Sequence, residues 1–293
     1  MAQYRIITDS TTDLSPELVK EMDVDVIPMT FVLDGKTYHN TPDEAELSSK
    51  DFYARVRAGS MPTTSQINGE TLREFVEPYL KAGTDVLYLA FSSGLSGTYN
   101  AARLAFEDLR EEYPERKVIV VDTLGASMGE GLMVYLACKE RDKGKSAEEV
   151  AAWVEENRLK LAHWFTVDDL NHLKRGGRVS GAAAFFGTML SIKPVLHVDD
   201  EGHLIPMEKV RGRRASLDAL VEHMAKTGVD NEHQTVFISH GDCEADVNYV
   251  ADKIRARFGT KDIYTNPIGP VIGAHSGPGT VALFFLASTR ACH

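Results

Sequence analysis

The chain has 293 residues, of which 43% are hydrophobic and 26% charged, and its formal net charge is −11. This length favours two domains, and the negative charge argues against nucleic acid or an anionic membrane as the main partner. The three cysteines are far apart and form no Cys-x-x-Cys pair, which indicates neither a disulfide framework nor a cysteine zinc site. The N-terminal sequence lacks the features of a signal peptide, and the apolar runs are too short to span a bilayer. We therefore expect a cytoplasmic protein without stable membrane insertion.

The first 160 residues alternate between strand and helix about four times, which predicts an α/β domain with a doubly wound parallel sheet. Ser15 with Pro16, and Ser48 with Asp51, are typical helix starts, and Asp34-Gly35 is a hairpin turn signal. Pro78 is expected to end or kink its helix early. The predicted strands are 4–8, 24–27, 29–33, 86–90 and 117–121; the predicted helices begin at 15 and cover 48–58, 68–80, 126–141 and 146–159; and 37–47 reads as polar and irregular.

The pattern changes near Leu161, so we predict two domains, 1–161 and 162–293, with a ligand bound between them. In the second, hairpin strands at 195–198 and 204–210 precede two amphipathic helices, 213–226 and 244–258, around a strand at 235–239. This mixture favours an α+β class. The segment 181–192 reads as a helix of small and apolar residues that is buried or lines an apolar cavity.

The stretch Val86–Ala102 predicts a strand, a Ser/Gly turn and a helix, and the first turn of such a helix presents N–H groups that favour an anion. Between Phe91 and Ala102 there is no Lys or Arg, so a carboxylate suits this turn better than a phosphate. Ser96 as a simple helix cap is the alternative interpretation.

Three segments, 61–66, 91–98 and 267–280, read as loops rich in Ser, Thr and Gly that contain no Lys or Arg and hold one histidine, His275. Neutral donors beside the apolar segments 181–192 and 281–287 predict a ligand with an acid head and an apolar tail. Burying about sixteen methylenes at roughly 0.8 kcal/mol each supplies ample affinity, so the head group need only orient the ligand.

Other motifs are incomplete. Lys139 stands where a P-loop ending at Gly144-Lys145-Ser146 needs its first glycine, and Gly273–Gly279 does not match the dinucleotide fingerprint. The segment Gly94–Thr98 falls one residue short of Gly-x-Ser-x-Gly, because Thr98 replaces the last glycine. The histidines show no metal-binding spacing. We therefore expect no metal or cofactor, and a sugar-phosphate module would require cations in these loops.

Several segments together resemble the DegV family of bacterial fatty-acid-binding proteins, in the family's order from near residue 1 to beyond 280. They are Thr8-Asp9-Ser10-Thr11, Pro62-Thr63-Thr64-Ser65-Gln66, Ser92-Ser93-Gly94-Leu95-Ser96-Gly97-Thr98-Tyr99, Asp169-Leu170 with Gly176-Gly177-Arg178-Val179-Ser180, Lys193-Pro194, Glu208-Lys209-Val210-Arg211, and Gly269-Pro270 with His275-Ser276-Gly277-Pro278-Gly279.

The resemblance implies two α/β domains with a long-chain fatty acid, such as palmitate or oleate, between them. It also implies the B-type subunit of a fatty acid kinase, which presents the acyl carboxylate to a separate ATP-using subunit. In that arrangement this chain is a carrier and the partner is the catalyst.

We assign Thr64 and Ser96 as carboxylate donors, with Ser93 and the backbone of Gly94 nearby, and His275 either donates to the same oxygen or orders its loop. Thr63, Ser65 and Ser92 are secondary candidates. A serine hydrolase or acyltransferase with Ser96 or Ser93 as nucleophile and His275 as base remains the alternative.

Two further groups complete the predicted sites. The candidates for tail contact, for which core packing is the alternative, are Phe185, Phe186, Met189 and Leu190. The candidates for docking the kinase subunit, for which solvated surface is the alternative, are Arg178, Arg211 and Arg213, within the basic sets that also hold Lys174, Arg175 and Arg214.

Overall fold

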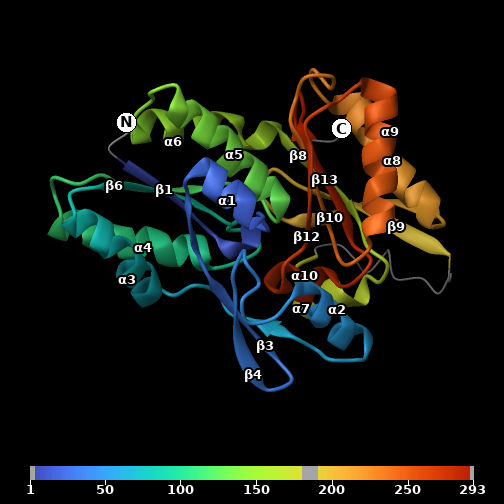
Figure 1. Cartoon of the computed structure of the whole chain (residues 1–293), viewed down its shortest axis with the longest axis horizontal. Helices are drawn as coiled ribbons and strands as arrows, with labels where there is room; N and C mark the ends of the chain where they lie inside the picture. The colour runs from blue at the N-terminus through green and yellow to red at the C-terminus, as the bar shows by residue number, and fades with distance from the viewer. Residues whose placement is uncertain (1–3, 180–190, 291–293) are drawn as a thin grey trace.

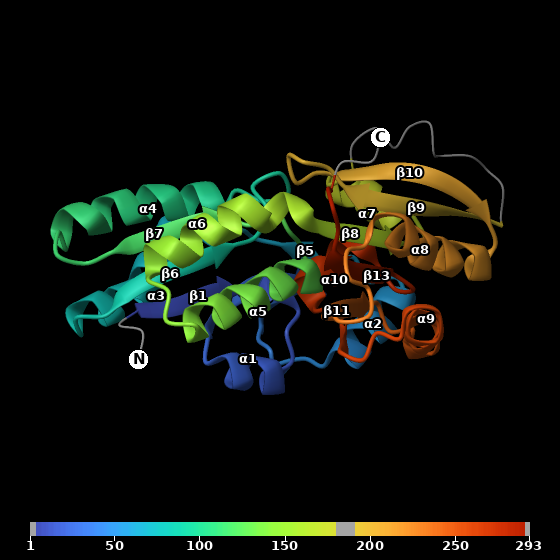
Figure 2. The same cartoon turned by 90° about the horizontal axis from the view of Figure 1, so that it is seen from above.

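The computed structural model describes residues 4–179 and 191–290, which form an elongated molecule of two parts lying side by side (Figures 1 and 2). The first part is built on a parallel sheet and the second on a mixed sheet, so the predicted fold class is confirmed. Within the described ranges, no helix combines the length and apolar character needed to cross a membrane.

The first part contains a four-stranded parallel sheet in the order β2-β1-β6-β7. Its strands are β1 (Tyr4–Asp9), β2 (Asp25–Ile27), β6 (Asp85–Ala90) and β7 (Val118–Asp122). Alternate residues of β6 face opposite sides: Leu87 and Leu89 join one apolar cluster, whereas Val86 and Tyr88 join the other. Both faces are buried, which explains the unbroken apolar run in the sequence.

Helices cover the two faces of this sheet (Figure 1). On one side lie α3 (Gly69–Lys81) and α4 (Thr98–Glu112); on the other lie α1 (Pro16–Met22), α5 (Met128–Asp142) and α6 (Ala147–Asn157). The predicted starts are confirmed at α1, where the Ser15 side chain accepts from Leu18 N–H, and at α6, where Ser146 and Glu149 form a capping box.

A small antiparallel sheet, β4-β3-β5, lies below the parallel sheet in Figure 1. It comprises β3 (Met29–Leu33), β4 (Lys36–Asn40) and β5 (Thr63–Thr64). Helix α2 (Ser49–Arg57) lies between β4 and β5 along the chain. The prediction that 37–47 is irregular was wrong over Thr37–Asn40, because the Asp34-Gly35 turn pairs this polar edge strand with β3. Early termination of α3 at Pro78 was also wrong, since the helix continues to Lys81.

The second part contains a six-stranded sheet in the order β10-β9-β8-β13-β11-β12, in which β11 and β12 run parallel and the other described neighbours run antiparallel. Its strands are β8 (Leu161–Thr166), β9 (Ile192–Val198), β10 (Leu204–Arg211), β11 (Val236–His240), β12 (Ile263–Pro267) and β13 (Val281–Leu286). Two helices, α8 (Arg213–Thr227) and α9 (Glu244–Phe258), cover one face. The predicted 195–198/204–210 hairpin is therefore confirmed.

Two short helices, α7 (Asn171–Gly176) and α10 (Pro270–Ser276), follow strands β8 and β12 of the mixed sheet and pack against each other. The prediction of a loop over 267–280 was wrong in its middle, where Pro270 occupies the first helical position and fixes a φ suited to a helix. The predicted helix at 181–192 lies outside the described residues except for Ser191 and Ile192, and Ile192 begins β9.

Helix α5 packs against both large sheets. Its residues Leu132 and Met133 belong to one apolar cluster with Leu89 of β6 and with Phe237 and Phe284 of the mixed sheet. The predicted domain boundary near Leu161 coincides with the start of β8. The boundary itself stays a proposal, because this cluster joins the two parts into one core.

Candidate functional site

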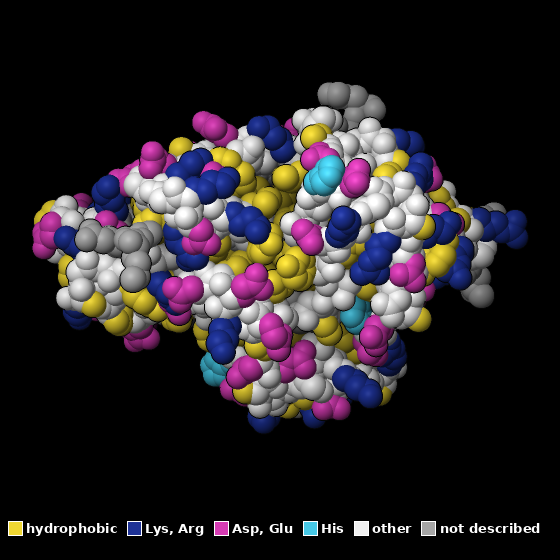
Figure 3. Space-filling view, turned by 45° about the horizontal axis from the view of Figure 1, so that its top comes forward, with side chains coloured by type: hydrophobic (Ala, Val, Ile, Leu, Met, Phe, Trp, Pro, Cys, Tyr) yellow, Lys and Arg dark blue, Asp and Glu magenta, His cyan; other side chains and the backbone are white. Residues whose placement is uncertain are grey.

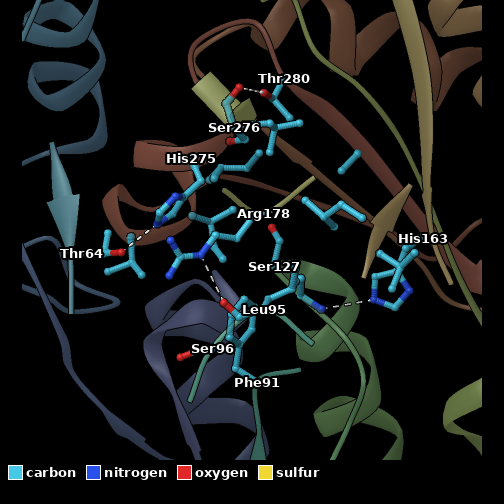
Figure 4. A pocket seen from close by; sticks show the side chains of 18 of the residues that line it. Thr64, Phe91, Leu95, Ser96, Ser127, His163, Arg178, His275, Ser276 and Thr280 are labelled. Carbon is cyan, nitrogen blue, oxygen red and sulfur yellow. Dashed lines mark hydrogen bonds between the residues drawn. The ribbon is translucent and has the colours of Figure 1, made fainter. Parts of the chain in front are cut away.

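A cavity of about 300 Å³ lies where the loops of the two parts meet (Figure 4). This volume falls at the lower end of the range for small-molecule sites in proteins. Its wall is mainly apolar, with a group of polar side chains at one side. The lining residues are Met29, Thr64, Ser65, Gln66, Phe91, Leu95, Ser96, Gly97, Ala126, Ser127, His163, Phe165, Leu173, Arg178, Val198, Leu204, Ile268, Val271, Ile272, His275, Ser276, Thr280, Ala282 and Phe284.

The polar group contains the side chains predicted to bind a carboxylate. Thr64 lies on β5, where the alternation of the strand directs it inward while Thr63 is exposed. Thr64 Oγ1 is 2.8 Å from His275 Nε2 on α10, so segments 211 residues apart meet here. Ser96, just before α4, lines the same cavity. The structure thus brings Thr64, Ser96 and His275 to one site (Figure 4).

His275 is a neutral imidazole at physiological pH. Burial lowers its pKa to about 4, and the positive charge of Arg178 adds to the effect. Its Nδ1 atom faces Gly176, where an added Cβ would lie 2.2 Å away. In the described part of the chain, neither His275 Nδ1 nor the hydroxyl of Ser276 has a hydrogen-bond partner, although both are buried. Unpartnered polar atoms at a cavity wall favour a ligand with polar groups.

Arg178 changes the electrostatics predicted for this site. It was expected on a docking surface, but it lines the cavity, and its Nε donates to Leu95 O at 3.3 Å beside Ser96. The three segments 61–66, 91–98 and 267–280 do lack Lys and Arg. The guanidinium beside them belongs to Arg178, which follows the end of α7 by two residues. The polar side of the cavity therefore carries the positive charge of Arg178, which favours an anion.

Ser96 also supports the start of α4. Its Oγ accepts from the N–H of Thr98 at 3.2 Å and is 3.0 Å from Thr98 Oγ1. The capping interpretation thus describes part of its role, although Gly97 is the residue at the cap position. Because Ser96 contacts Thr98 and His275 contacts Thr64, these distances favour binding roles over a Ser96–His275 nucleophile and base pair.

Four other candidates lie outside the cavity lining. Ser92 is buried and donates to Gly202 O in the β9–β10 turn at 2.8 Å, while the N–H of Gly94 binds Ser92 Oγ. Ser93 and Thr63 are exposed, and the N–H of Ser93 donates to Asp122. Of the secondary candidates, Ser65 does line the cavity.

The apolar wall comes from both parts of the molecule. It includes Phe165, Ala282 and Phe284 of the mixed sheet, and Met29 and Phe91 of the first part. The predicted apolar segment 281–287 therefore contributes. The other predicted tail contacts, Phe185, Phe186, Met189 and Leu190, lie outside the described residues.

Two polar lining residues, His163 and Ser127, lie outside the predicted loops and outside every predicted site. His163, on β8, is fully enclosed: its Nδ1 is 3.1 Å from Leu161 O, and its Nε2 accepts from the N–H of Ala126 at 3.3 Å. Ser127, in the loop before α5, also reaches the cavity. Ser127 could have been singled out from the sequence, because it is the serine of a Gly-x-Ser-x-Gly pattern that begins at Gly125 and ends at Gly129. Nothing in the sequence placed His163 at the site.

The remaining docking candidates lie at the surface. Arg211 is exposed at the end of β10, whereas Arg213 is partly buried and bonded to Asp246 at 2.9 Å. Figure 3 shows Lys and Arg mixed with Asp and Glu, with hydrophobic side chains gathered in a hollow between the two parts. Among the described residues, no group of three His, Cys, Asp or Glu side chains is arranged to hold a metal.

Comparison with known proteins extends over almost the entire chain. The model of the DegV family of uncharacterised proteins matches residues 3–288. A DegV domain-containing protein of Clostridium perfringens is 46% identical over 290 residues, with 99% of each chain covered. A Thermotoga maritima structure described as a DegV lipid-binding protein superposes with a TM-score of 0.87 at 33% identity, covering 99% of this chain and 100% of that one. A Thermus thermophilus structure described as fatty acid binding of a DegV family protein gives 0.86 at 32% identity, with 97% and 99% covered. This chain belongs to the DegV family.

Proposed function

We propose that this chain binds a long-chain fatty acid, such as palmitate or oleate, in the cavity between its two parts. The observation that carries the proposal is the continuity of one cavity: Thr64, Ser96, His275 and Arg178 lie at its polar side, and apolar residues form the rest of its wall. The two solved relatives described as lipid-binding and fatty-acid-binding support the same ligand class.

The proton arrangement suits a carboxylate. With its proton on Nε2, neutral His275 donates to Thr64 Oγ1, which leaves the Thr64 hydroxyl proton for the ligand. Ser96 adds a second hydroxyl, and Arg178 offsets the negative charge. We assign no ligand contact to Ser92 or Gly94, because their polar atoms are already bonded within the turn and to the β9–β10 connection.

The acyl chain supplies most of the affinity. Transferring about sixteen methylenes from water, at roughly 0.8 kcal/mol each, contributes on the order of 13 kcal/mol before the costs of association. The polar side therefore sets the orientation of the ligand, with its carboxylate near the exposed Arg178 and its methyl end in the apolar part.

Native mass spectrometry of the purified protein tests this function. We expect an added mass that matches an intact free fatty acid, and we expect the Thr64→Ala/Ser96→Ala variant to lose it. The matched control is Thr63→Ala/Ser93→Ala, which alters exposed neighbours that do not line the cavity and should retain the ligand. A wild-type chain that stays bare in the presence of palmitate and oleate contradicts the proposal.

We also propose that the carboxylate is presented to a separate ATP-dependent fatty acid kinase subunit. Support comes from Arg178, which joins the polar side of the cavity to the surface, and from the exposed Arg211. Arg211→Glu should lower acyl-phosphate formation by a kinase subunit at least tenfold without changing fatty acid binding. Arg255→Glu, an exposed site on α9, is the control. Unchanged acyl-phosphate formation in Arg211→Glu removes this residue from the docking surface.

A further inference from the structure

The chain holds a complete Gly-x-Ser-x-Gly pattern at Gly125–Gly129, separate from the incomplete one at 94–98. It follows β7 and runs into the first turn of α5, which is the strand, turn and helix setting in which a nucleophile elbow presents its serine. Ser127 has φ 53° and ψ −148°. A serine adopts this left-handed conformation only where its surroundings impose it, and such residues cluster at functional sites.

The hydroxyl of Ser127 is hydrogen-bonded to a carboxyl group, and the residue lines the cavity. Ser127 is 4% exposed and lines the proposed acyl site. Its Oγ donates to Asp13 Oδ2 at 2.5 Å and is 2.8 Å from Ser239 Oγ. The other oxygen of Asp13 accepts from the N–H of Gly269 at 2.9 Å. Asp13 is thus held in place to receive a proton from Ser127.

The surroundings of the turn are also ordered. His163 Nε2 accepts from the N–H of Ala126, the residue before Ser127, while its Nδ1 is bonded to Leu161 O. Gly129 is required for this packing, because a Cβ there would lie 2.2 Å from His163 Nε2. Met128 begins α5, and the N–H at a first helical position has no intrahelical carbonyl partner, so it is suited to stabilise an oxyanion.

We propose that Ser127 is a nucleophile that accepts the acyl group of a long-chain carboxylic ester bound in this cavity, with Asp13 as the proton acceptor. Ser127 Oγ forms a bond to the carbonyl carbon, the bond from that carbon to the alcohol oxygen breaks, and the hydroxyl proton passes through Asp13 to the departing alkoxide. Water then attacks the acyl-serine, which releases the free fatty acid and restores the serine hydroxyl. The net reaction is ester plus water to acid plus alcohol.

The protonation of Asp13 gives this reaction a characteristic pH dependence. Burial raises the pKa of Asp13 to about 8, and the negative charge of Asp9 on β1 adds to the shift. The other titratable groups that interact with it are Glu130 on α5 and Tyr53 on α2, both with pKa values raised by burial. The fraction of Asp13 able to accept a proton therefore rises about tenfold per pH unit up to pH 8.

The experiment uses a fluorophosphonate with a long alkyl chain, which labels activated serines, on the full chain. We expect labelling at Ser127, competition by palmitate, and a labelling rate that rises about tenfold from pH 6.5 to 7.5 and levels off above pH 8. Ser127→Gly should abolish labelling at this site and should fold, because glycine adopts this φ without strain. Asp13→Asn should remove the pH dependence, and Ser288→Ala, at an exposed serine outside the cavity lining, should still be labelled.

Fatty acid binding is measured on the same samples by native mass spectrometry, so failure of this proposal is distinct from failure of the binding function. A wild-type protein that binds palmitate but is not labelled overturns the nucleophile. Labelling that persists in Ser127→Gly, or that maps to Ser96 or Ser93, overturns it as well. Release of 4-nitrophenol from 4-nitrophenyl palmitate by the wild type and not by Ser127→Gly would confirm turnover.

Discussion

Gly176 determines where the imidazole of His275 sits. An added Cβ would lie 2.2 Å from His275 Nδ1, although Gly176 is an ordinary helical residue of α7 that alanine otherwise suits. We expect Gly176→Ala to displace His275 from Thr64 and weaken fatty acid binding about tenfold, which corresponds to about 1.4 kcal/mol, the size of one hydrogen bond.

A fluorescent fatty acid displacement assay measures this effect. Gly69→Ala is the matched control, because a Cβ there meets Ala105 Cβ at an ordinary 3.6 Å and lies away from the cavity. Equal affinities for the wild type and Gly176→Ala would show that the position of His275 does not matter for binding.

Asp13 should make the stability of the protein depend on pH. Its pKa is raised by burial to about 8, whereas an unfolded aspartate titrates near 3.9. Between these values the folded state binds a proton that the unfolded state does not, so this contribution is complete below about pH 4 and is lost as pH rises toward 8. Each pH unit in this window lowers the free energy of unfolding by about 1.4 kcal/mol.

Asp13→Asn keeps a similar shape and removes this titration, so its stability curve should lack that slope relative to the wild type. Urea unfolding at pH 5, 6, 7 and 8 measures the difference. Buried groups that do not interact with Asp13, such as His163, contribute equally to both proteins and cancel in the comparison. Parallel curves for the two proteins would place the pKa of Asp13 near its ordinary value.

At the scale of elements, Arg290, which follows β13, holds several connections of the fold together. Its guanidinium is buried and donates to Leu161 O at 3.0 Å, Leu124 O at 2.6 Å and Arg158 O at 2.6 Å. Burial lowers its pKa to about 10, so the group remains charged at neutral pH.

Arg290→Met should lower the free energy of unfolding by about 3 kcal/mol, because the carbonyl groups of Leu161, Leu124 and Arg158 lose a charged donor. Guanidinium unfolding monitored by circular dichroism measures this loss. Arg255→Met, an exposed arginine on α9, is the control and should stay within about 0.5 kcal/mol of the wild type. A similarly small change in Arg290→Met would mean that water replaces the lost donor without cost.

Elements with strong local signals were predictable, and those that depend on distant contacts were not. Local sequence patterns were enough to predict strand β6 and the starts of α1, α2 and α6. Burial on both faces gives β6 an unbroken apolar run, and N-terminal capping places a serine before each of these helices. Helix α10 could not be predicted in this way, because its glycines resemble a loop and its packing against α7 and β5 involves residues far away in the sequence.

The same distinction applies to the site. Thr64, Ser96 and His275 were predicted from their residue types and now line one cavity, whereas Arg178 reaches it only because α7 packs beside α10. The Gly125–Gly129 pattern was readable in the sequence, but the bond from Ser127 to Asp13 joins residues 114 positions apart. Its significance therefore emerged from the fold.

At the scale of the whole molecule, α5 makes one core of the two parts. Its apolar residues pack on the parallel sheet and also on the mixed sheet, and Tyr135 contacts Phe237 of β11 with ring centroids 5.6 Å apart. Since unfolding either part exposes apolar surface of the other, we expect a single cooperative transition rather than two.

The two tryptophans report separately on the two parts, because Trp153 lies on α6 and Trp164 on β8. In Trp153→Phe and in Trp164→Phe, the fluorescence of the remaining tryptophan should therefore follow the same urea midpoint as the far-ultraviolet circular dichroism of that variant. Leu132→Ala, in the shared cluster on α5, should shift both signals together by about 2–5 kcal/mol. Separate midpoints for Trp153 and Trp164 would instead mean that the parts unfold independently and that the ligand cavity opens without loss of either sheet.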